Sequence, residues 1–291
     1  MDALIHTMYS SDFYRIMDFK CRCVDCSVSK PEYSNSFCIS FVRKGNFLFN
    51  VFRQSLDSFS GCVLITKPGY EHTVTHTHST PDECSIFDFN KDFSNEIALM
   101  YGKTKFFLDN DIHSTLVKTS PELEWLHYYI YQLLIDKAGS KLQLDNMVME
   151  IVHRVLLAVT DYKPDERITP QLKKNHLHTI ELAKLYMSSH FNDDISLMEI
   201  AKHCHVSPFH FSRIFKTFTG TSPHQFLLAI RLQHAALLLQ DTNLPVADIA
   251  FSVGFNSIEH FNAAFRQKFR TAPSLARVVK KSAISEISKI P

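Results

Sequence analysis

The C-terminal part of this 291-residue chain contains a sequence repeat with a period of about 50 residues. In each copy an Ile-Ala pair, at 200–201 and at 249–250, precedes a short turn and a second helical segment. Aromatic and proline positions recur after the turn, in the pairs Phe211 and Phe261, Phe215 and Phe265, and Pro223 and Pro273. A repeat of this kind encodes one supersecondary unit per copy. It predicts two helix-turn-helix units whose aromatic side chains pack the paired helices together.

Capping residues mark the helix ends within the repeat. The predicted caps and turns are Ser196 with Glu199, Ser207 before Pro208, and Gly254 followed by Asn256 or Ser257. Serine accepts hydrogen bonds from the first free backbone N–H groups of a helix, and a glutamate three residues later completes a capping box. All segments after residue 175 are therefore expected to be helical.

The second helix of each unit is expected to expose its N-terminal half, the part that enters the major groove in helix-turn-helix proteins. The outward residues of the first unit are Phe209, His210, Ser212, Arg213 and Lys216, and those of the second are Ile258, Glu259, His260, Asn262 and Arg266. These ten residues are the predicted DNA-binding positions. The alternative is a basic helical bundle whose aromatic residues only fill its core, but it does not explain the repeat.

The chemistry of these side chains suits double-stranded DNA. Arg213 can donate two hydrogen bonds to guanine, Ser212 can address several bases, and Phe209 can contact thymine methyl groups. In the second unit Asn262 suits adenine, while Arg266 suits phosphates.

The charge distribution divides the chain. With 31 Lys and Arg against 30 Asp and Glu, the formal charge of +1 gives no sign of a nucleic-acid partner. Residues 1–170 hold 17 basic and 22 acidic side chains, a charge of −5, whereas residues 171–291 hold 14 and 8, a charge of +6. The difference suggests that only the C-terminal part approaches a polyanion. A chance fluctuation of surface charge would give the same numbers.

The preceding sequence predicts strands first and helices later. Residues 37–93 form short runs rich in Phe, Val, Ile and Thr, typical of a sandwich or barrel, and FCISFVRKGNFLFNVF predicts a hairpin around Gly45. From Pro121 to about residue 162 the apolar residues follow the period of two amphipathic helices. These helices either pack on the β domain or pair with a second subunit.

The C-terminal sequence resembles the AraC/XylS family of bacterial transcription regulators. The resemblance covers about 175–280 and is carried by IAKHCHVSPFHFSRIFKTFTGTSPHQFLLAIRLQHAALLL and VADIAFSVGFNSIEHFNAAFRQKFRTAP. It implies two helix-turn-helix units joined by a long helix at about 223–239. Ala263 stands where members often have Arg, and Arg270 where Gly is common. We therefore expect weaker base reading by the second unit, through His260 and Asn262 with phosphate contacts.

The N-terminal part, especially GCVLITKPGYEH, is similar to the cupin-type β barrel that many members of this family carry. The resemblance implies a domain that binds a small effector or mediates dimerisation. A barrel of this size can enclose one small ligand, and the expected pocket residues are Phe41, Phe47, Phe49, Phe52 and Tyr70. Alternatively, these aromatic residues fill the core.

A histidine motif has the composition of a metal site. His76 and His78, followed by Glu83, resemble the first metal motif of cupin enzymes, because alternate residues of a strand point the same way. No clear second-strand histidine accompanies them, and an ordinary surface strand is the preferred interpretation.

A cysteine cluster can also bind metal or respond to oxidation. Cys21, Cys23 and Cys26 form a C-x-C-x-x-C pattern, with Cys84 elsewhere in the same domain. Thiolates at this spacing can bind zinc or form a disulfide. Free thiols in an N-terminal arm are the preferred interpretation, and no metal or cofactor is predicted.

These features predict a multidomain α and β chain. We expect a cupin-like sensing domain at 1–119, a helical connector with candidate dimerisation helices at 120–162, a linker at 163–175, and an all-α DNA-binding domain with two helix-turn-helix units at 176–281. The expected function is transcription regulation, activation included, and not catalysis. The alternative is a metal-dependent cupin-type enzyme with a helical interaction domain.

The expected partners are double-stranded DNA, a small-molecule effector, RNA polymerase and a second copy of the chain. No membrane is expected, because there is no run of about 18 apolar residues. The first 20 residues lack the pattern of a secretory signal. The predicted location is the cytoplasm.

Overall fold

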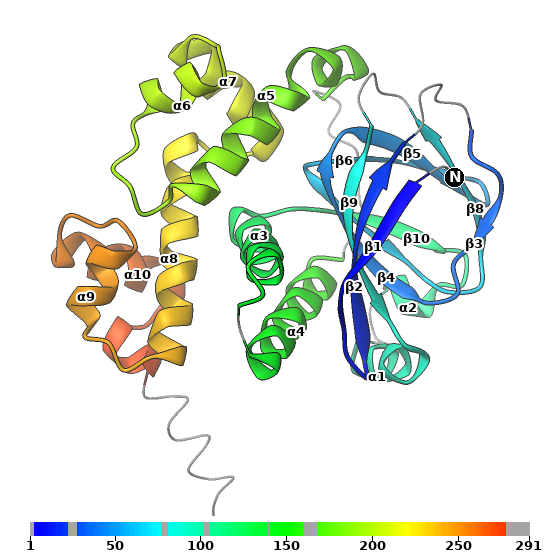
Figure 1. Cartoon of the computed structure of the whole chain (residues 1–291), viewed down its shortest axis with the longest axis horizontal. Helices are drawn as coiled ribbons and strands as arrows, with labels where there is room; N and C mark the ends of the chain where they lie inside the picture. Colours follow the sequence, from blue (N-terminus) through cyan, green and yellow to red (C-terminus); the bar gives the residue numbers. More distant parts are fainter. Residues whose placement is uncertain are drawn as a thin grey trace, which may run out of the picture. The chain divides into compact units, whose positions relative to one another are not determined.

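The structure, a computed structural model, describes residues 3–22, 28–76, 81–101, 105–138, 140–159 and 168–277 (Figure 1). The chain forms two compact units. The first consists of Met1–Glu181 with Thr217–Thr219, and the second of Leu182–Lys216 with Gly220–Pro291. Both β-sheets belong to the first unit, and the described part of the second is helical. The prediction of strands followed by an all-α C-terminal part is confirmed.

Two antiparallel sheets form the β part of the first unit. The six-stranded sheet has the spatial order β1 (Ala3–Ser10), β2 (Tyr14–Cys21), β9 (Glu83–Phe89), β4 (Phe37–Lys44), β7 (Cys62–Thr66) and β10 (Ser114–Lys118). The four-stranded sheet has the order β3 (Glu32–Tyr33), β8 (Glu71–His76), β5 (Asn46–Val51) and β6 (Gln54–Phe59). Among the described residues these sheets are not joined into one closed barrel, so the cupin-like barrel stays a prediction.

The predicted hairpin around Gly45 is wrong, because its two strands belong to different sheets. β4 pairs with β7 and β9, whereas β5 pairs with β6 and β8. Only Gly45 separates β4 from β5, and the common hairpin loops need two or more residues. Its φ of +78° is a left-handed conformation that glycine adopts without steric penalty. The chain therefore turns a corner at Gly45 and enters the other sheet.

The N-terminal segment is a hairpin and not an arm. β1 pairs with β2, and β2 continues the sheet by pairing with β9. Tyr14 and Ile16 alternate along β2 with their side chains buried, and Cys21 at its end is also buried. The placement of Cys21 in a free arm is therefore corrected. Cys23 and Cys26 lie outside the described residues.

In the first unit, α1 (Lys91–Tyr101) and α2 (Lys105–Leu108) lie between β9 and β10, and α3 (Pro121–Ile135) and α4 (Lys141–Leu157) follow β10. Serines at 120 and 140 cap α3 and α4. The predicted apolar stripes are buried within the unit, as Trp125 on α3 and Val148 on α4 illustrate. Tyr14 Oη on β2 donates a hydrogen bond of 2.7 Å to Asp145 on α4. Both helices thus pack within their own unit, and dimerisation stays a prediction.

Helix α5 (Pro170–Ser189) begins inside the range predicted as the linker and runs from the first unit into the second. It is followed by α6 (Leu197–His203), α7 (Pro208–Thr219), α8 (Pro223–Asp241), α9 (Val246–Ser252) and α10 (Ile258–Phe269) (Figure 1). Each copy of the repeat gives one short and one longer helix, with α8 between the copies. Among the described residues, no helix is long and apolar enough to cross a membrane.

Candidate nucleic-acid interface

The two turns of the repeat have the same backbone geometry. After α6, His205 has a φ of +56°, and the following residue donates its N–H to the Ala201 carbonyl at 3.0 Å. After α9, Gly254 has a φ of +86°, and the following residue donates to the Ala250 carbonyl at 3.1 Å. A left-handed residue with this hydrogen bond is the Schellman ending of a helix. Both turns therefore lead the chain into the next helix in the same way.

The predicted caps are present. Ser196 and Glu199 form a complete capping box at α6, and Ser207 caps α7. Ser257, and not Asn256, caps α10. Hydrogen bonds from the backbone and side chain of Ser196 lower the pKa of Glu199. The caps fix where α7 and α10 begin, and hence which residues occupy their first two turns.

Buried aromatic side chains hold each pair of helices together. The ring centroids of Phe211 and Phe215 are 5.4 Å apart, and Phe215 meets Phe226 of α8 edge-on at 5.3 Å. The rings of Phe261 and Phe265 on α10 are 5.6 Å apart. Phe211, Phe215, Phe261 and Phe265 are the phenylalanines of the repeat, and they are buried together with Phe226. The predicted aromatic packing is confirmed.

The predicted base-reading side chains of α7 lie on its accessible face. Phe209, Arg213 and Lys216 are exposed, and His210 and Ser212 are half-buried. Phe209 is 83% exposed. The three exposed residues are spaced i, i+4 and i+7, so they form one stripe along the helix. This stripe combines one apolar side chain with two cations.

The corresponding residues of α10 are also accessible. Glu259, His260 and Arg266 are exposed, and Ile258 and Asn262 are half-buried. The stripe at equivalent positions reads glutamate at 259, alanine at 263 and arginine at 266. It therefore carries opposite charges at its two ends.

Glu259 distinguishes the second helix-turn-helix unit from the first. Ser257 Oγ donates a hydrogen bond of 2.7 Å to its carboxylate. Hydrogen bonds from Ser257 and from the backbone of Glu259 itself lower the pKa of this carboxyl group. The group is ionised at neutral pH, so it repels phosphates near the start of α10.

Arg231 on α8 connects the second helix-turn-helix unit to the segment after α5. Its Nε donates to the Phe191 carbonyl and its Nη2 to the Asp193 carbonyl, both at 2.7 Å. The guanidinium also lies against the turn at Gly254. The turn, α8 and the segment after α5 thus form one packed region behind α10.

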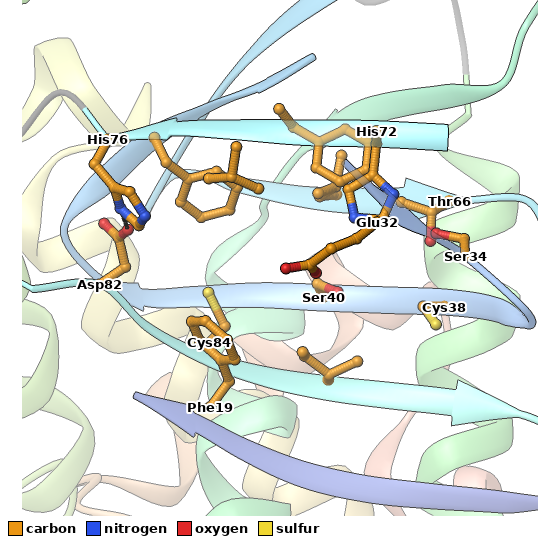
Figure 2. A pocket seen from close by; sticks show the side chains of 15 residues that line it. Phe19, Glu32, Ser34, Cys38, Ser40, Thr66, His72, His76, Asp82 and Cys84 are labelled. Atoms are coloured by element: carbon orange, nitrogen blue, oxygen red, sulfur yellow. Dashed lines mark hydrogen bonds and ion pairs between the residues drawn. The ribbon is translucent and has the colours of Figure 1, made fainter. Parts of the chain in front are cut away.

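The first unit contains a cavity of about 170 Å³ between its two sheets (Figure 2). At one end Glu32 and His72 contribute polar groups, and Phe47, Phe49 and Leu64 contribute apolar surface. Burial lowers the pKa of His72, partly opposed by the Glu32 carboxylate. The lining suits a small molecule with both apolar and polar parts.

Of the five expected pocket residues, two line the cavity and three do not. Phe47 and Phe49 line the cavity. Phe41 is buried and stacks on a histidine of α3, at position 127, with ring centroids 4.3 Å apart. Phe52 is 71% exposed, and Tyr70 packs on the histidine at position 113. The assignment of Phe41, Phe52 and Tyr70 to the cavity is wrong, because Phe41 packs against α3, while Phe52 and Tyr70 lie in the connections after β5 and before β8.

At the other end of the cavity, three side chains with metal-binding or acid–base chemistry come together. His76 Nδ1 lies 2.7 Å from Asp82 Oδ2, and Cys21 Sγ lies 4.0 Å from both ring nitrogens of His76. Burial, together with the Glu181 carboxylate, raises the pKa of Asp82 to about 8, and burial lowers the pKa of His76. The His–Asp pair can therefore share one proton without a net charge.

The histidine motif predicted from the sequence is not assembled in its expected form. Glu83 points to cations, with Lys44 Nζ and an Arg43 Nη2 each 3.9 Å away, and not to His76. His78 lies outside the described residues. Asp82 is not part of the predicted histidine motif. Its signal is the alternation of residues 82, 84 and 86, all of which line the cavity.

The family match lies in the helical part of the chain. A family profile described as "Helix-turn-helix domain" matches residues 200–277. Regulatory protein PocR of Salmonella typhimurium is 26% identical over 137 residues, which cover 47% of this chain and 45% of PocR. The chain thus spans about half the length of that relative. The uncharacterized HTH-type transcriptional regulator YdeC of Bacillus subtilis is 24% identical over 242 residues, 80% of each chain.

A solved structure is similar to part of this chain. The C-terminal domain of AraT, a response regulator from Geobacillus stearothermophilus, is 33% identical and covers 35% of this chain and 84% of that chain, with a TM-score of 0.34.

Proposed function

Since the chain belongs to the AraC/XylS family of transcription regulators, we propose that it binds double-stranded DNA sequence-specifically and regulates transcription. The observation that carries this proposal is the duplicated turn, at His205 and at Gly254, each leading into a capped helix with an accessible first half. In helix-turn-helix proteins this part of the second helix enters the major groove. The charge of +6 on residues 171–291 supports a polyanionic partner.

The first unit of the repeat is proposed to read bases. Arg213 is exposed on the accessible stripe of α7 and can bond guanine O6 and N7 with two donors. Phe209, next to it on the stripe, can contact thymine methyl groups, and Ser212 can address several bases. Lys216 lies further along the helix, where a phosphate contact is the expected role.

The second helix-turn-helix unit is proposed to contribute fewer base contacts than the first. Ala263 occupies the position equivalent to Arg213, so it offers no hydrogen bond. His260 and Asn262 remain as base-contacting candidates, and Arg266 as a phosphate contact.

Binding-site selection from random duplexes with the full chain tests the proposal. The best selected duplex and a scrambled duplex of equal length are then titrated with three variants. Arg213→Ala should weaken binding to the selected duplex by about 1–3 kcal/mol and relax the preference at one base pair. Lys216→Ala should weaken both duplexes similarly and reduce the salt dependence. Lys141→Ala, an exposed charge on α4, is the matched control and should change neither.

Two outcomes contradict the proposal at different levels. Equal losses on both duplexes for Arg213→Ala would remove its base-reading role. Failure of the full chain to enrich any sequence would remove sequence-specific DNA binding itself.

The N-terminal compact unit, which contains both sheets, is proposed to sense a small-molecule effector in the cavity between them. Preferential binding to one conformation would shift the population of DNA-bound arrangements. We further propose that the chain contacts RNA polymerase, pairs with a second copy of itself and acts in the cytoplasm. Isothermal titration of the full chain with a metabolite library, followed by the DNA assay with each hit, tests the sensing role.

A further inference from the structure

We propose that Cys21, His76 and Asp82 bind a divalent transition-metal ion, with Zn²⁺ as the best match, at one end of the cavity. The three residues offer a thiolate, an imidazole and a carboxylate, and their ligand atoms all lie within 4.8 Å of one another. Zinc accepts exactly this mixture of S, N and O donors in tetrahedral sites, whereas Mg²⁺ and Ca²⁺ prefer oxygen alone. The inference is independent of the proposed DNA binding.

The distances between the ligand atoms bracket those expected around a zinc ion. Zn–S bonds of about 2.3 Å and Zn–N or Zn–O bonds of about 2.0–2.1 Å place tetrahedral ligand atoms roughly 3.3–3.6 Å apart. The separations of 2.7 Å between His76 Nδ1 and Asp82 Oδ2, and 4.0 Å between Cys21 Sγ and the His76 ring, lie on either side of that range. Small side-chain rotations suffice to surround an ion. On binding, the ion replaces the thiol proton of Cys21 and the proton shared by His76 and Asp82, and both protons leave to solvent.

The strands hold the three residues in place. Cys21 ends β2, His76 ends β8, and Asp82 directly precedes β9. The Cys21 N–H donates to the Asp82 carbonyl at 2.9 Å, which fixes these two residues side by side. His76 pairs with Phe47 across the β8–β5 ladder. A site built on paired strands is preorganised, so little ordering of the backbone is required for binding.

The surroundings are closed to bulk water but open to the cavity. Cys21, His76 and Asp82 are 5%, 7% and 1% exposed. Figure 2 shows His76 and Asp82 together at one end of the cavity, with Cys84 close by. Since His76 and Asp82 line the cavity, a small molecule bound there could supply a fourth ligand.

A catalytic Cys-His-Asp arrangement is the competing interpretation of the same residues. In such an arrangement one ring nitrogen of the histidine accepts the thiol proton along its own axis while the other bonds the carboxylate. Here Cys21 Sγ is equally distant, at 4.0 Å, from both nitrogens of His76. The sulfur is therefore not directed at one nitrogen, and a shared ion accounts better for the geometry.

Cobalt binding to the full chain, first stripped of metal with a chelator, tests the site. One Co²⁺ per chain should bind and give a sulfur-to-cobalt charge-transfer band in the near ultraviolet, and Zn²⁺ should displace it. Cys21→Ser should abolish or strongly reduce this band, and Asp82→Asn should weaken Co²⁺ affinity at least about tenfold. Cys38→Ser is the matched control, because Cys38 lines the other end of the cavity (Figure 2). It should leave both the band and the affinity unchanged.

A second readout protects the test against misfolded variants. Zn²⁺ should raise the unfolding midpoint of the wild-type first unit, followed by the fluorescence of Trp125, and should not raise that of Asp82→Asn. If Cys21→Ser does not fold, the Co²⁺ affinity and the Zn²⁺-dependent unfolding midpoint of Asp82→Asn decide the outcome.

Three results would overturn the site. These are the absence of saturable Co²⁺ binding, unchanged binding in both Cys21→Ser and Asp82→Asn, and loss of binding in a Cys23→Ser/Cys26→Ser double variant. The last result would assign the metal to the other cysteines of the C-x-C-x-x-C pattern.

Discussion

Replacement of Gly254 by alanine tests how tightly the second turn of the repeat is packed. Its φ of +86° disfavours a side chain, and an added Cβ would lie 2.8 Å from the Asn192 carbonyl oxygen and 3.0 Å from Arg231 Nε. Gly69 provides a matched control, because its φ is +91° but no atom lies within 4 Å of an added Cβ. The pair therefore separates the conformational cost from the steric cost.

The magnitudes follow from these two costs. Alanine in the left-handed region costs about 1–2 kcal/mol, and restriction of the unfolded chain offsets about 0.4–1 kcal/mol of this. At Gly254 the overlap adds an overpacking cost of about 1–3 kcal/mol. Arg231 cannot move away without losing its bonds to two carbonyl groups. We expect Gly69→Ala to lower the free energy of unfolding by about 1 kcal/mol and Gly254→Ala by about 2–4 kcal/mol.

Urea denaturation with two signals distinguishes the two units. The single tryptophan of the chain, Trp125, is buried on α3 and reports on the first unit. Far-ultraviolet circular dichroism also reports on the helices of the second unit. Gly254→Ala should shift the dichroism transition and leave the fluorescence transition in place, whereas Gly69→Ala should shift the fluorescence transition. Equal destabilisation by the two substitutions would refute the steric argument.

Three further substitutions probe other parts of the fold. Burial lowers the pKa of His127 to about 3, whereas its value in the unfolded chain is about 6.5. The unfolded chain therefore binds a proton below pH ~6.5 that the folded protein does not, so the free energy of unfolding falls on acidification. Trp125 fluorescence in urea should show a loss of about 2 kcal/mol from pH 7 to pH 5, and His127→Gln should remove that part of the pH dependence. Arg270→Gly removes a left-handed arginine, φ +58°, at the end of α10, and should raise stability by about 1 kcal/mol in the dichroism transition. Tyr14→Phe deletes the bond to Asp145 and should lower the stability of the first unit by about 1–2 kcal/mol, and an unchanged fluorescence transition would show that this bond contributes nothing.

The helical part could be predicted largely from the sequence, because its determinants are local. Caps at Ser196, Ser207 and Ser257 act on backbone groups two or three residues away. Gly254 marked the second turn by residue type alone. The first turn places His205 in the same conformation, which residue type does not signal. The sequence indicated a turn before Ser207, but not the left-handed conformation of His205.

The β part could be predicted less well, because strand pairing is not local. The pattern around Gly45 gave the two strands correctly but assigned them to one hairpin, when they belong to two sheets. Phe52 was misplaced for a separate reason, since it lies exposed in the turn between β5 and β6. The approach of Cys21 to Asp82 depends on the pairing of β2 with β9, which are separated by about 60 residues of sequence. Residue patterns within either strand carry no signal of that contact.

The repeat also shows how two copies of one fold come to differ in their expected role. The accessible stripe of α7 presents phenylalanine, arginine and lysine at 209, 213 and 216, whereas the equivalent stripe of α10 presents glutamate, alanine and arginine at 259, 263 and 266. The turns, caps and aromatic packing are shared, so backbone geometry does not cause this difference. An ionised Glu259 in the first turn opposes close approach to phosphates, and alanine at 263 removes the donor that could read a base. We therefore expect sequence discrimination to rest mainly on the first unit, with Arg266 of the second unit holding the DNA backbone.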